Sequence, residues 1–423
     1  MIETKKREKA LLVVAKTRED SWSQEMLAAE FRSLVLSTGI EVKELISFNL
    51  NQPNASLYIG KGKAEELKEI VEAKEINVVI FNSNLSYSQQ RNLEDLLELK
   101  TLDRTQLILD IFAKHAKTKE GSLQVELAQL QYLLPRLRGR GVMLSRLGGG
   151  IGTVGPGETK LEVDRRKISE KITRLKQEIA QVSQHRDTAR KKRQRQKIPV
   201  CSLVGYTNAG KTTLFNLLTE NSQKTSSDLF TTLDTVTRKT EIKEGLEAVV
   251  SDTVGFIYKL PPNLIDAFKA TLEELDYADL LLHVIDASSE NIAQIKKSVE
   301  QTLAELDLKD KAKLIVFNKI DNLNQVTLEK MERADPDSIF ISAATGQGIE
   351  ELKKEIYKHL SSNFLELVVK VPISRMDVIN FLHKHSQVLK TKYDKDNISC
   401  WIRISKSKLP FLKKENLKIT DLG

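Results

Sequence analysis

Three patterns of apolar and polar positions follow one another along the chain. Over residues 10–110, apolar runs such as Ala10–Ala15 and Val78–Phe81 alternate with segments of helical periodicity. The helical segments are 22–36, 64–73 and 86–99. Short apolar runs that alternate with amphipathic helices predict a small, largely parallel α/β sheet.

A seven-residue apolar repeat follows and occurs twice. Its members are Leu123, Leu127, Leu130, Leu134 and Leu137 in the first segment, and Ile168, Ile172, Leu175, Ile179 and Val182 in the second. Two such segments joined by a loop predict an antiparallel helical hairpin with coiled-coil packing. An apolar stripe at this spacing indicates core rather than a binding site.

From residue 198 the pattern changes to buried strands, each followed by a polar motif, which predicts a doubly wound, mostly parallel sheet. The tail alternates weakly over 365–371, is helical over 376–389 and has a strand over 398–404, so we expect a small α+β domain. A chain of 423 residues is too long for one core. The predicted domains are 1–115 (α/β), 116–197 (hairpin and basic linker), 198–362 (nucleotide domain) and 363–423 (α+β).

Composition restricts the compartment. The chain has two cysteines, Cys201 and Cys400, which gives no disulfide framework and fits a reducing cytosol. Its N-terminus is charged, and no apolar run is long enough to span a membrane. We therefore expect a cytoplasmic protein without a transmembrane segment, and peripheral membrane association stays open.

The net charge of +8 is distributed unevenly. Residues 136–197 carry +12 and residues 363–423 carry +6, whereas 1–135 carry −2 and 198–362 carry −8. Strongly basic blocks beside an acidic nucleotide domain favour a large polyanionic partner. A solvated helical face is the alternative explanation.

The loop between the two repeat segments, residues 148–158, holds six of the 19 glycines and is flanked by arginines. The arginines are Arg138, Arg140, Arg146, Arg165 and Arg166. Glycines permit close approach to another backbone, and arginines bind phosphates. A flexible hinge is the alternative. The second segment ends in a run from Arg186 to Lys197, in which seven of twelve residues are basic.

A complete phosphate loop lies between a buried strand and a helix. Its residues are Gly205, Tyr206, Thr207, Asn208, Ala209, Gly210, Lys211 and Thr212. The glycines let backbone N–H groups converge on phosphates at the positive end of the helix. Lys211 can reach the outer phosphate oxygens and neutralise charge in the transition state, and the Thr212 hydroxyl can ligate Mg²⁺.

Two further segments have the order that GTPases need. The first contains Phe230, Thr231, Thr232, Leu233 and Asp234, of which Thr232 can close over the γ-phosphate and ligate Mg²⁺. The second follows a strand and contains Asp252, Thr253, Val254 and Gly255. Asp252 can hold Mg²⁺ through a water, and the Gly255 N–H can sense the γ-phosphate.

The last two motifs address the base. Asp321 can accept from guanine N1–H and its 2-amino group together, which adenine cannot offer. Lys319 can lie over the base, and Asn318 can tie this loop to the phosphate loop. A backbone N–H of Ser342, Ala343 or Ala344 can meet guanine O6. Five motifs in this order predict a GTP/GDP site.

The residues over 145–166 and 200–260 resemble the HflX family of translation-factor-like GTPases. The match includes the glycine-rich loop with Glu158–Arg166 after it, the segment Phe230–Thr235 and the segment Asp252–Ile257. It spans about 10–362 and is weakest in the tail. The resemblance implies a cytoplasmic GTPase that binds the large ribosomal subunit and splits or rescues stalled ribosomes under stress. The basic 136–197 region would contact rRNA, the C-terminal domain could add a second RNA contact, and we expect a monomer.

Phe256 occupies the position where many GTPases have a water-orienting glutamine. A phenyl ring cannot orient water, so two explanations stay open. Either hydrolysis is slow until a partner reorders the switch segments, or another group, such as the Thr232 carbonyl, positions the water. Two alternative functions also remain: a regulatory GTPase that acts on a protein partner, and a GTPase subunit of tRNA modification.

Overall fold

The computed structural model describes residues 8–147, 160–196, 198–220, 236–243, 246–259, 261, 274–361, 364–405, 409–415 and 417–422. The chain forms two compact units. The first comprises Met1–Ala180, Ser226–Asp234 and Ile257–Lys269, and the second comprises Gln181–Thr225, Thr235–Phe256 and Ala270–Gly423. Each unit has its own sheets and core.

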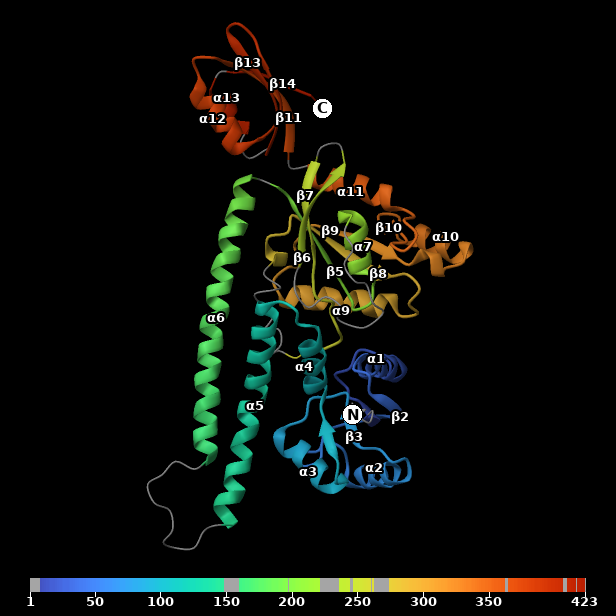
Figure 1. Cartoon of the computed structure of the whole chain (residues 1–423). Helices are drawn as coiled ribbons and strands as arrows, with labels where there is room; N and C mark the ends of the chain where they lie inside the picture. The colour runs from blue at the N-terminus through green and yellow to red at the C-terminus, as the bar shows by residue number, and fades with distance from the viewer. Residues whose placement is uncertain are drawn as a thin grey trace, which may run out of the picture. The chain divides into compact units, whose positions relative to one another are not determined.

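The first unit contains a four-stranded sheet in the order β2-β1-β3-β4, in which every pair is parallel. Its strands are β1 (Lys9–Lys16), β2 (Glu41–Asn49), β3 (Val78–Phe81) and β4 (Lys100–Leu102), and the helices between them are α1 (Gln24–Ser37), α2 (Lys61–Ala73) and α3 (Tyr87–Leu97). The predicted parallel α/β sheet is confirmed (Figure 1). Side-chain caps begin α1 at Ser23 and α3 at Ser86, because each hydroxyl accepts from a backbone N–H in the first turn.

Three further helices follow: α4 (Arg104–His115), α5 (Lys119–Leu147) and α6 (Lys160–Gln196). The apolar repeat joins α5 to α6, as predicted: Leu123 and Leu127 pack against Ile172 and Leu175 in one buried cluster. Figure 1 shows the two helices running side by side. The repeat therefore holds a hairpin together, as coiled-coil spacing requires.

Arg136 has an internal role that its place in the basic region does not suggest. Its guanidinium forms an ion pair with the buried carboxylate of Asp103 at 3.0 Å and donates to the Leu85 carbonyl at 2.9 Å. It also stacks on the Tyr132 ring. Arg136 therefore anchors α5 to the N-terminal sheet and does not belong to a free basic surface.

The second unit begins with a six-stranded sheet in the order β10-β9-β8-β5-β7-β6. Its strands are β5 (Val200–Gly205), β6 (Val236–Lys243), β7 (Leu246–Asp252), β8 (Leu280–Asp286), β9 (Lys313–Asn318) and β10 (Ile339–Phe340). Only β6 runs antiparallel, at one edge. Its helical segments are α7 (Lys211–Thr219), α9 (Ile292–Glu305), η1 (Ile320–Asn322), α10 (Gln325–Ala334) and α11 (Ile349–Ser361). The predicted doubly wound, mostly parallel sheet is confirmed.

A histidine lies in the middle of this sheet. His283 of β8 is fully buried between β5 and β9, and neither ring nitrogen has a hydrogen-bond partner among the described residues. Burial lowers its pKa to about 3, and nearby lysines add to the effect. The folded protein therefore contains His283 in its neutral form.

This histidine should make the protein sensitive to acid. The imidazole pKa is about 6.5 in an unfolded chain, so below that pH only the unfolded state takes up the proton. The neutral His283 ring therefore makes its full contribution to the free energy of unfolding above about pH 6.5. This contribution is lost as the pH falls toward the folded-state pKa of about 3. Urea unfolding at neutral and mildly acidic pH measures the free energy of unfolding. Its fall with decreasing pH should be less steep in His283→Leu than in the unaltered protein, by up to about 1.4 kcal/mol per pH unit. Equal pH slopes in the two proteins would contradict this prediction.

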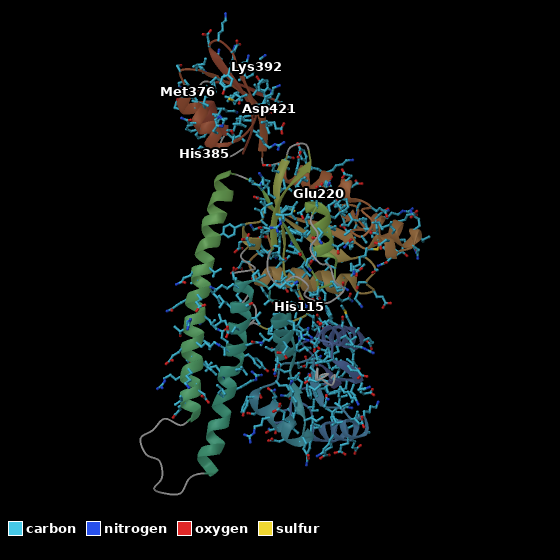
Figure 2. All side chains as sticks on the ribbon, in the orientation of Figure 1. His115, Glu220, Met376, His385, Lys392 and Asp421 are labelled. Carbon is cyan, nitrogen blue, oxygen red and sulfur yellow. The ribbon has the colours of Figure 1, made fainter. Side chains whose placement is uncertain are left out.

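The tail forms a third, antiparallel sheet in the order β12-β13-β11-β14. Its strands are β11 (Phe364–Pro372), β12 (Gln387–Tyr393), β13 (Asn397–Ser405) and β14 (Lys418–Asp421), and its helices are α12 (Met376–His385) and α13 (Leu409–Lys414). Figure 2 marks Met376 and His385 at the ends of α12, and Lys392 and Asp421 on the sheet. The predicted α+β tail is confirmed.

Candidate nucleotide site

The phosphate loop connects β5 to α7 at the carboxyl edge of the parallel sheet. Gly205 has φ 151° and Gly210 has φ 89°, a region that side-chain-bearing residues rarely adopt. A Cβ at Gly210 would lie 2.2 Å from Asn318 Nδ2, and one at Gly205 would lie 2.2 Å from the Val284 carbonyl oxygen. Both glycines are therefore required by the space around the loop as well as by its backbone conformation.

Lys211 begins α7 and folds back over the loop. Its Nζ donates to the Gly205 carbonyl at 3.1 Å and to the Tyr206 carbonyl at 2.8 Å, and only 6% of the residue is exposed. Burial lowers the pKa of this ammonium to about 8, whereas nearby Asp252 acts in the opposite direction. Burying a cation is costly when its hydrogen bonds go only to carbonyl dipoles, and phosphate oxygens would be better partners for it.

Thr212, in the first turn of α7, meets Asp252, the last residue of β7. The Thr212 hydroxyl donates to the Asp252 carboxylate at 2.8 Å. Thr253, one residue on, is buried and donates to the Leu203 carbonyl at 2.6 Å, so its side chain secures β5 and points away from the loop. Val254 is buried next to it. A hydroxyl beside a carboxylate is an oxygen pair of the kind that Mg²⁺ prefers.

The loop after β7 pairs with the phosphate loop through its backbone. The Thr207 N–H donates to the Phe256 carbonyl at 2.9 Å, and the Phe256 N–H donates to the Gly205 carbonyl at 3.0 Å. A Cβ at Gly255 would come within 3.0 Å of Lys211 Nζ. The Phe256 side chain is 4% exposed, so the ring packs in the interior. The backbone of this loop, rather than the phenyl ring, is what faces the phosphate loop.

The base-reading motifs lie at the ends of β9 and β10. Asn318 is buried and donates to the Ala209 carbonyl at 2.9 Å, while its oxygen accepts from the Ala343 N–H at 2.9 Å. The bond to Ala209 ties the loop after β9 to the phosphate loop, which is the contact expected from the sequence; the bond from Ala343, which adds the Ser342–Ala344 segment, was not predicted. Asp321 lies exposed in η1, and Ala344 is exposed after buried Ser342 and Ala343.

The structure brings four of the five predicted motifs to one edge of one sheet. They follow β5, β7, β9 and β10, whose carboxyl ends coincide because the strands are parallel. Asn208 and Ala209 complete the loop, with Ala209 buried and Asn208 exposed. The fifth motif, Phe230, Thr231, Thr232, Leu233 and Asp234, lies outside the described residues, as does the glycine-rich loop 148–158.

One partner of the site was not predicted from the sequence. Asp286, at the end of β8, forms an ion pair with Lys319 at 2.7 Å. Asp286 is the last residue of a buried strand that lies between β5 and β9, and this position could have identified it as a site residue from the sequence. This ion pair fixes the Lys319 side chain, whose residue has a φ of 65°.

Tyr258, two residues after Phe256, makes contacts that the sequence did not predict. It belongs to the first compact unit, where its ring stacks on Trp22 with centroids 4.3 Å apart. The Tyr258 hydroxyl accepts from the Ser21 N–H at 3.0 Å, and its carbonyl accepts from Arg104 at 2.8 Å. Lys259 forms an ion pair with Asp20 at 2.8 Å. We call residues Tyr258 and Lys259 with these partners the N-terminal clasp; no pattern in the sequence indicated it.

Comparisons with known proteins agree with this geometry. The family descriptions that match are "GTP-binding GTPase N-terminal" over residues 25–113, "GTP-binding GTPase Middle Region" over 115–193 and "50S ribosome-binding GTPase" over 200–319. GTPase HflX of Caldanaerobacter subterraneus is 44% identical over 93% of this chain and 90% of its own length. The chain belongs to the HflX family.

Another relative and a solved structure are also similar to this chain. GTPase HflX of Escherichia coli is 42% identical over 86% of each chain. The crystal structure of a complex of SsGBP and GDP aligns at 28% identity over 84% of this chain and 99% of that chain, with a TM-score of 0.46.

This HflX-family protein is therefore a GTP-binding and GTP-hydrolysing enzyme, and the GTPase predicted from the sequence is confirmed. Its nucleotide domain belongs to a family of ribosome-binding GTPases. Within the part of the chain that the structure describes, no helix combines the length and the apolar character needed to cross a bilayer.

Proposed function

We propose that this HflX-family protein binds the large ribosomal subunit in its GTP state and couples hydrolysis to the dissociation or rescue of stalled ribosomes. The observation that carries the proposal is the combination, in one chain, of a GTPase domain with a hairpin region of net charge +12. A region of this charge has the electrostatics for rRNA phosphates. The domain boundaries 1–115, 116–197, 198–362 and 363–423, a monomeric state and a cytoplasmic location belong to the same proposal.

In the proposed mechanism the phosphate loop holds the β- and γ-phosphates through the backbone N–H groups from Asn208 to Thr212. Lys211 would exchange the carbonyls of Gly205 and Tyr206 for phosphate oxygens and would neutralise charge that develops in the transition state. The burial that lowers its pKa also removes competing water. Gly255 would donate its N–H to the γ-phosphate, and Asp321 would accept from the guanine edge.

The Thr212–Asp252 oxygen pair fits a Mg²⁺ ion, which would be held by Thr212 and Thr232, with Asp252 acting through a water. Such an ion supplies positive charge beside the phosphates. The chain's own contribution is to hold these oxygens in position: Asp252 ends a buried strand, and Thr212 lies in the first turn of α7.

Phe256 supports slow hydrolysis in the absence of a partner. Its ring is buried, and its backbone is already paired with Gly205 and Thr207, so the side chain cannot orient a water. The Thr232 carbonyl is the candidate group for that task. Placement of this carbonyl beside the attacking water by the ribosome would then raise the rate, and a GTP hydrolysis assay with purified large subunits tests the idea.

The N-terminal clasp supports communication between the nucleotide and the N-terminal sheet. Phe256 pairs with the phosphate loop, and two residues later Tyr258 is held by Trp22, Ser21 and Arg104. Arg104 is itself buried in a two-point ion pair with Glu30, with atoms 2.6 and 3.0 Å apart. A change in the backbone conformation of the loop after β7 would therefore be transmitted along the chain to Tyr258 and its buried partners.

The basic run that ends α6 provides a direct test. Charge reversal of Arg190, Lys191, Lys192 and Arg193 to glutamate should abolish most co-sedimentation with large subunits, because each lost phosphate contact weakens binding and the new charges repel rRNA. The prediction rests on sequence charge, since the side chains from 183 to 196 lie outside the described residues. The matched control reverses four exposed lysines of the nucleotide domain: Lys297, Lys309, Lys330 and Lys354. Equal pelleting of both variants would show that the run only solubilises the protein.

The alternative functions differ in what they require. A regulatory GTPase with a protein partner predicts binding that changes little with salt, whereas an rRNA-dominated partner predicts a steep dependence. A GTPase subunit of tRNA modification would need a reactive cysteine for its chemistry. Cys400 is buried in the C-terminal sheet, and burial raises the pKa of its thiol, so it is poorly suited to that chemistry.

A further inference from the structure

Helices of the C-terminal domain cover one face of its sheet, and no helix of this domain that the structure describes packs on the other face, which we call the open face. The chain order β11-α12-β12-β13-α13-β14 and the strand order β12-β13-β11-β14 form a β-α-β-β-α-β domain. Its core contains the alternate strand residues Leu367, Val369, Cys400 and Ile402, packed against helix residues such as Leu382. Both described helices therefore cover the same face of the sheet, and the other alternate residues point to the opposite face.

The open face has an aromatic residue at its centre. Trp401 lies between Cys400 and Ile402 on β13, one of the two central strands. Its cross-strand neighbours are Val368 on β11 and Lys390 on β12, and Lys390 Nζ lies 5.6 Å from the Trp401 ring centroid. The ring is partly exposed, so a flat ligand can reach it.

A row of lysines crosses the sheet beside this tryptophan. The register aligns Lys392 of β12 with Ser399, Ser399 with Lys370 of β11, and Lys370 with Lys418 of β14. All three lysines are exposed, and none forms an ion pair with any residue that the structure describes. On the other side of Trp401, Arg403 is 4% exposed and paired with Glu366. The free positive charge of the face is therefore concentrated on one side of the ring.

We infer that this face, which we call the Trp401 face, binds single-stranded RNA. One unstacked base would stack on the Trp401 ring, and the lysine row would contact the phosphates that follow. Aromatic residues on the open sheet of a β-α-β-β-α-β domain suit splayed-out bases, whereas a duplex keeps its bases stacked and presents only its backbone and groove edges. Lys390, whose Nζ lies over the Trp401 ring, would leave that ring and contact a phosphate. The inference does not depend on the GTPase site or on the basic hairpin.

Tryptophan fluorescence of the full chain tests the stacking directly. The chain has two tryptophans, so a Trp22→Phe background leaves Trp401 as the only indole. Titration with a short, unstructured oligouridylate should quench its emission saturably, because a stacked base deactivates the excited ring. An unchanged emission over a titration in which the oligonucleotide binds would overturn the stacking assignment.

Variants separate base stacking from charge. Trp401→Ala should weaken oligouridylate binding roughly 5- to 100-fold, the range for loss of one base–aromatic stack, and Trp401→Phe should retain most of the affinity. Replacement of Lys370, Lys392 and Lys418 by glutamine should lower the slope of log affinity against log salt by about 2. The matched control replaces Lys297, Lys309 and Lys330 by glutamine and should leave both quantities unchanged.

Each outcome is decisive for the Trp401 face. Loss of binding in the Trp401→Ala and triple-lysine variants, with GTP hydrolysis unchanged, supports it. If the control variant loses as much affinity as the triple-lysine variant, the attraction is general and the inference fails. Tighter binding of an RNA duplex than of the single strand would also overturn it, as would affinity that is the same in Trp401→Ala and the unaltered protein while both retain their thermal stability.

Discussion

Replacement of Lys211 by alanine is expected to lower the rate of GTP hydrolysis by about 100- to 1,000-fold, the cost of removing one preorganised charge from a phosphoryl-transfer site. The ammonium is buried beside the loop that would carry the phosphates, and two carbonyls hold it there. Single-turnover hydrolysis with saturating GTP measures the chemical step without interference from weakened binding.

The nucleotide-free protein should respond differently to the same change. Burial lowers the pKa of Lys211 to about 8 from 10.5. The cost to stability therefore begins below pH 10.5, where the unfolded chain binds the proton, and is complete below about pH 8, where the folded protein also holds the charge. Lys211→Ala should therefore keep or raise the thermal stability of the apo protein while it loses activity. Lys297→Ala, on the exposed side of α9, serves as the control and should change neither property. Full activity in Lys211→Ala would remove this lysine from the mechanism.

Asp321→Asn is expected to abolish the preference for guanine, with a loss of GTP affinity of at least about 100-fold. An asparagine offers one acceptor where the aspartate offers two, and its amide N–H₂ meets the donors of guanine. Xanthine carries an oxygen in place of the 2-amino group, so xanthosine triphosphate should bind the variant better than GTP does. Competition against labelled GDP measures both effects.

The matched control is Asp337→Asn, an exposed carboxylate in the loop before β10. It removes the same charge from the nucleotide domain without touching η1, and nucleotide preference should be unaltered. An Asp321→Asn protein that still prefers GTP to xanthosine triphosphate would show that the base is read elsewhere.

The parts of the fold that the sequence predicted are those where local pattern and burial agree. β1, β3 and β5 each contain a run of buried residues, and the α5–α6 hairpin repeats its apolar positions every seven residues. β2 is an edge strand whose residues are mostly half-buried, so its alternation is weak and the strand was not identified. α4 was missed because it is buried on several sides, which leaves little helical periodicity.

The candidate site was predictable where a motif directly follows a strand. The bond from Asn318 to Ala209 was anticipated for this reason. The Thr212–Asp252 contact and the bond from Ala343 to Asn318 were not predicted. Contacts between segments far apart in the chain could not be predicted. Arg136 was counted with a basic surface because a count of charges does not show the buried Asp103 that pairs with it. In the same way, nothing near Tyr258 in the sequence points to Trp22, which lies more than two hundred residues earlier.

The central claim is that the bound nucleotide controls the affinity of this protein for rRNA. The most direct test is co-sedimentation with purified large ribosomal subunits, in GDP and in a non-hydrolysable GTP analogue. We predict that the protein pellets with large subunits in the GTP analogue, remains mostly in the supernatant in GDP, and is released from the pellet by added salt. Equal pelleting in the two nucleotides, or none in either, would contradict the account.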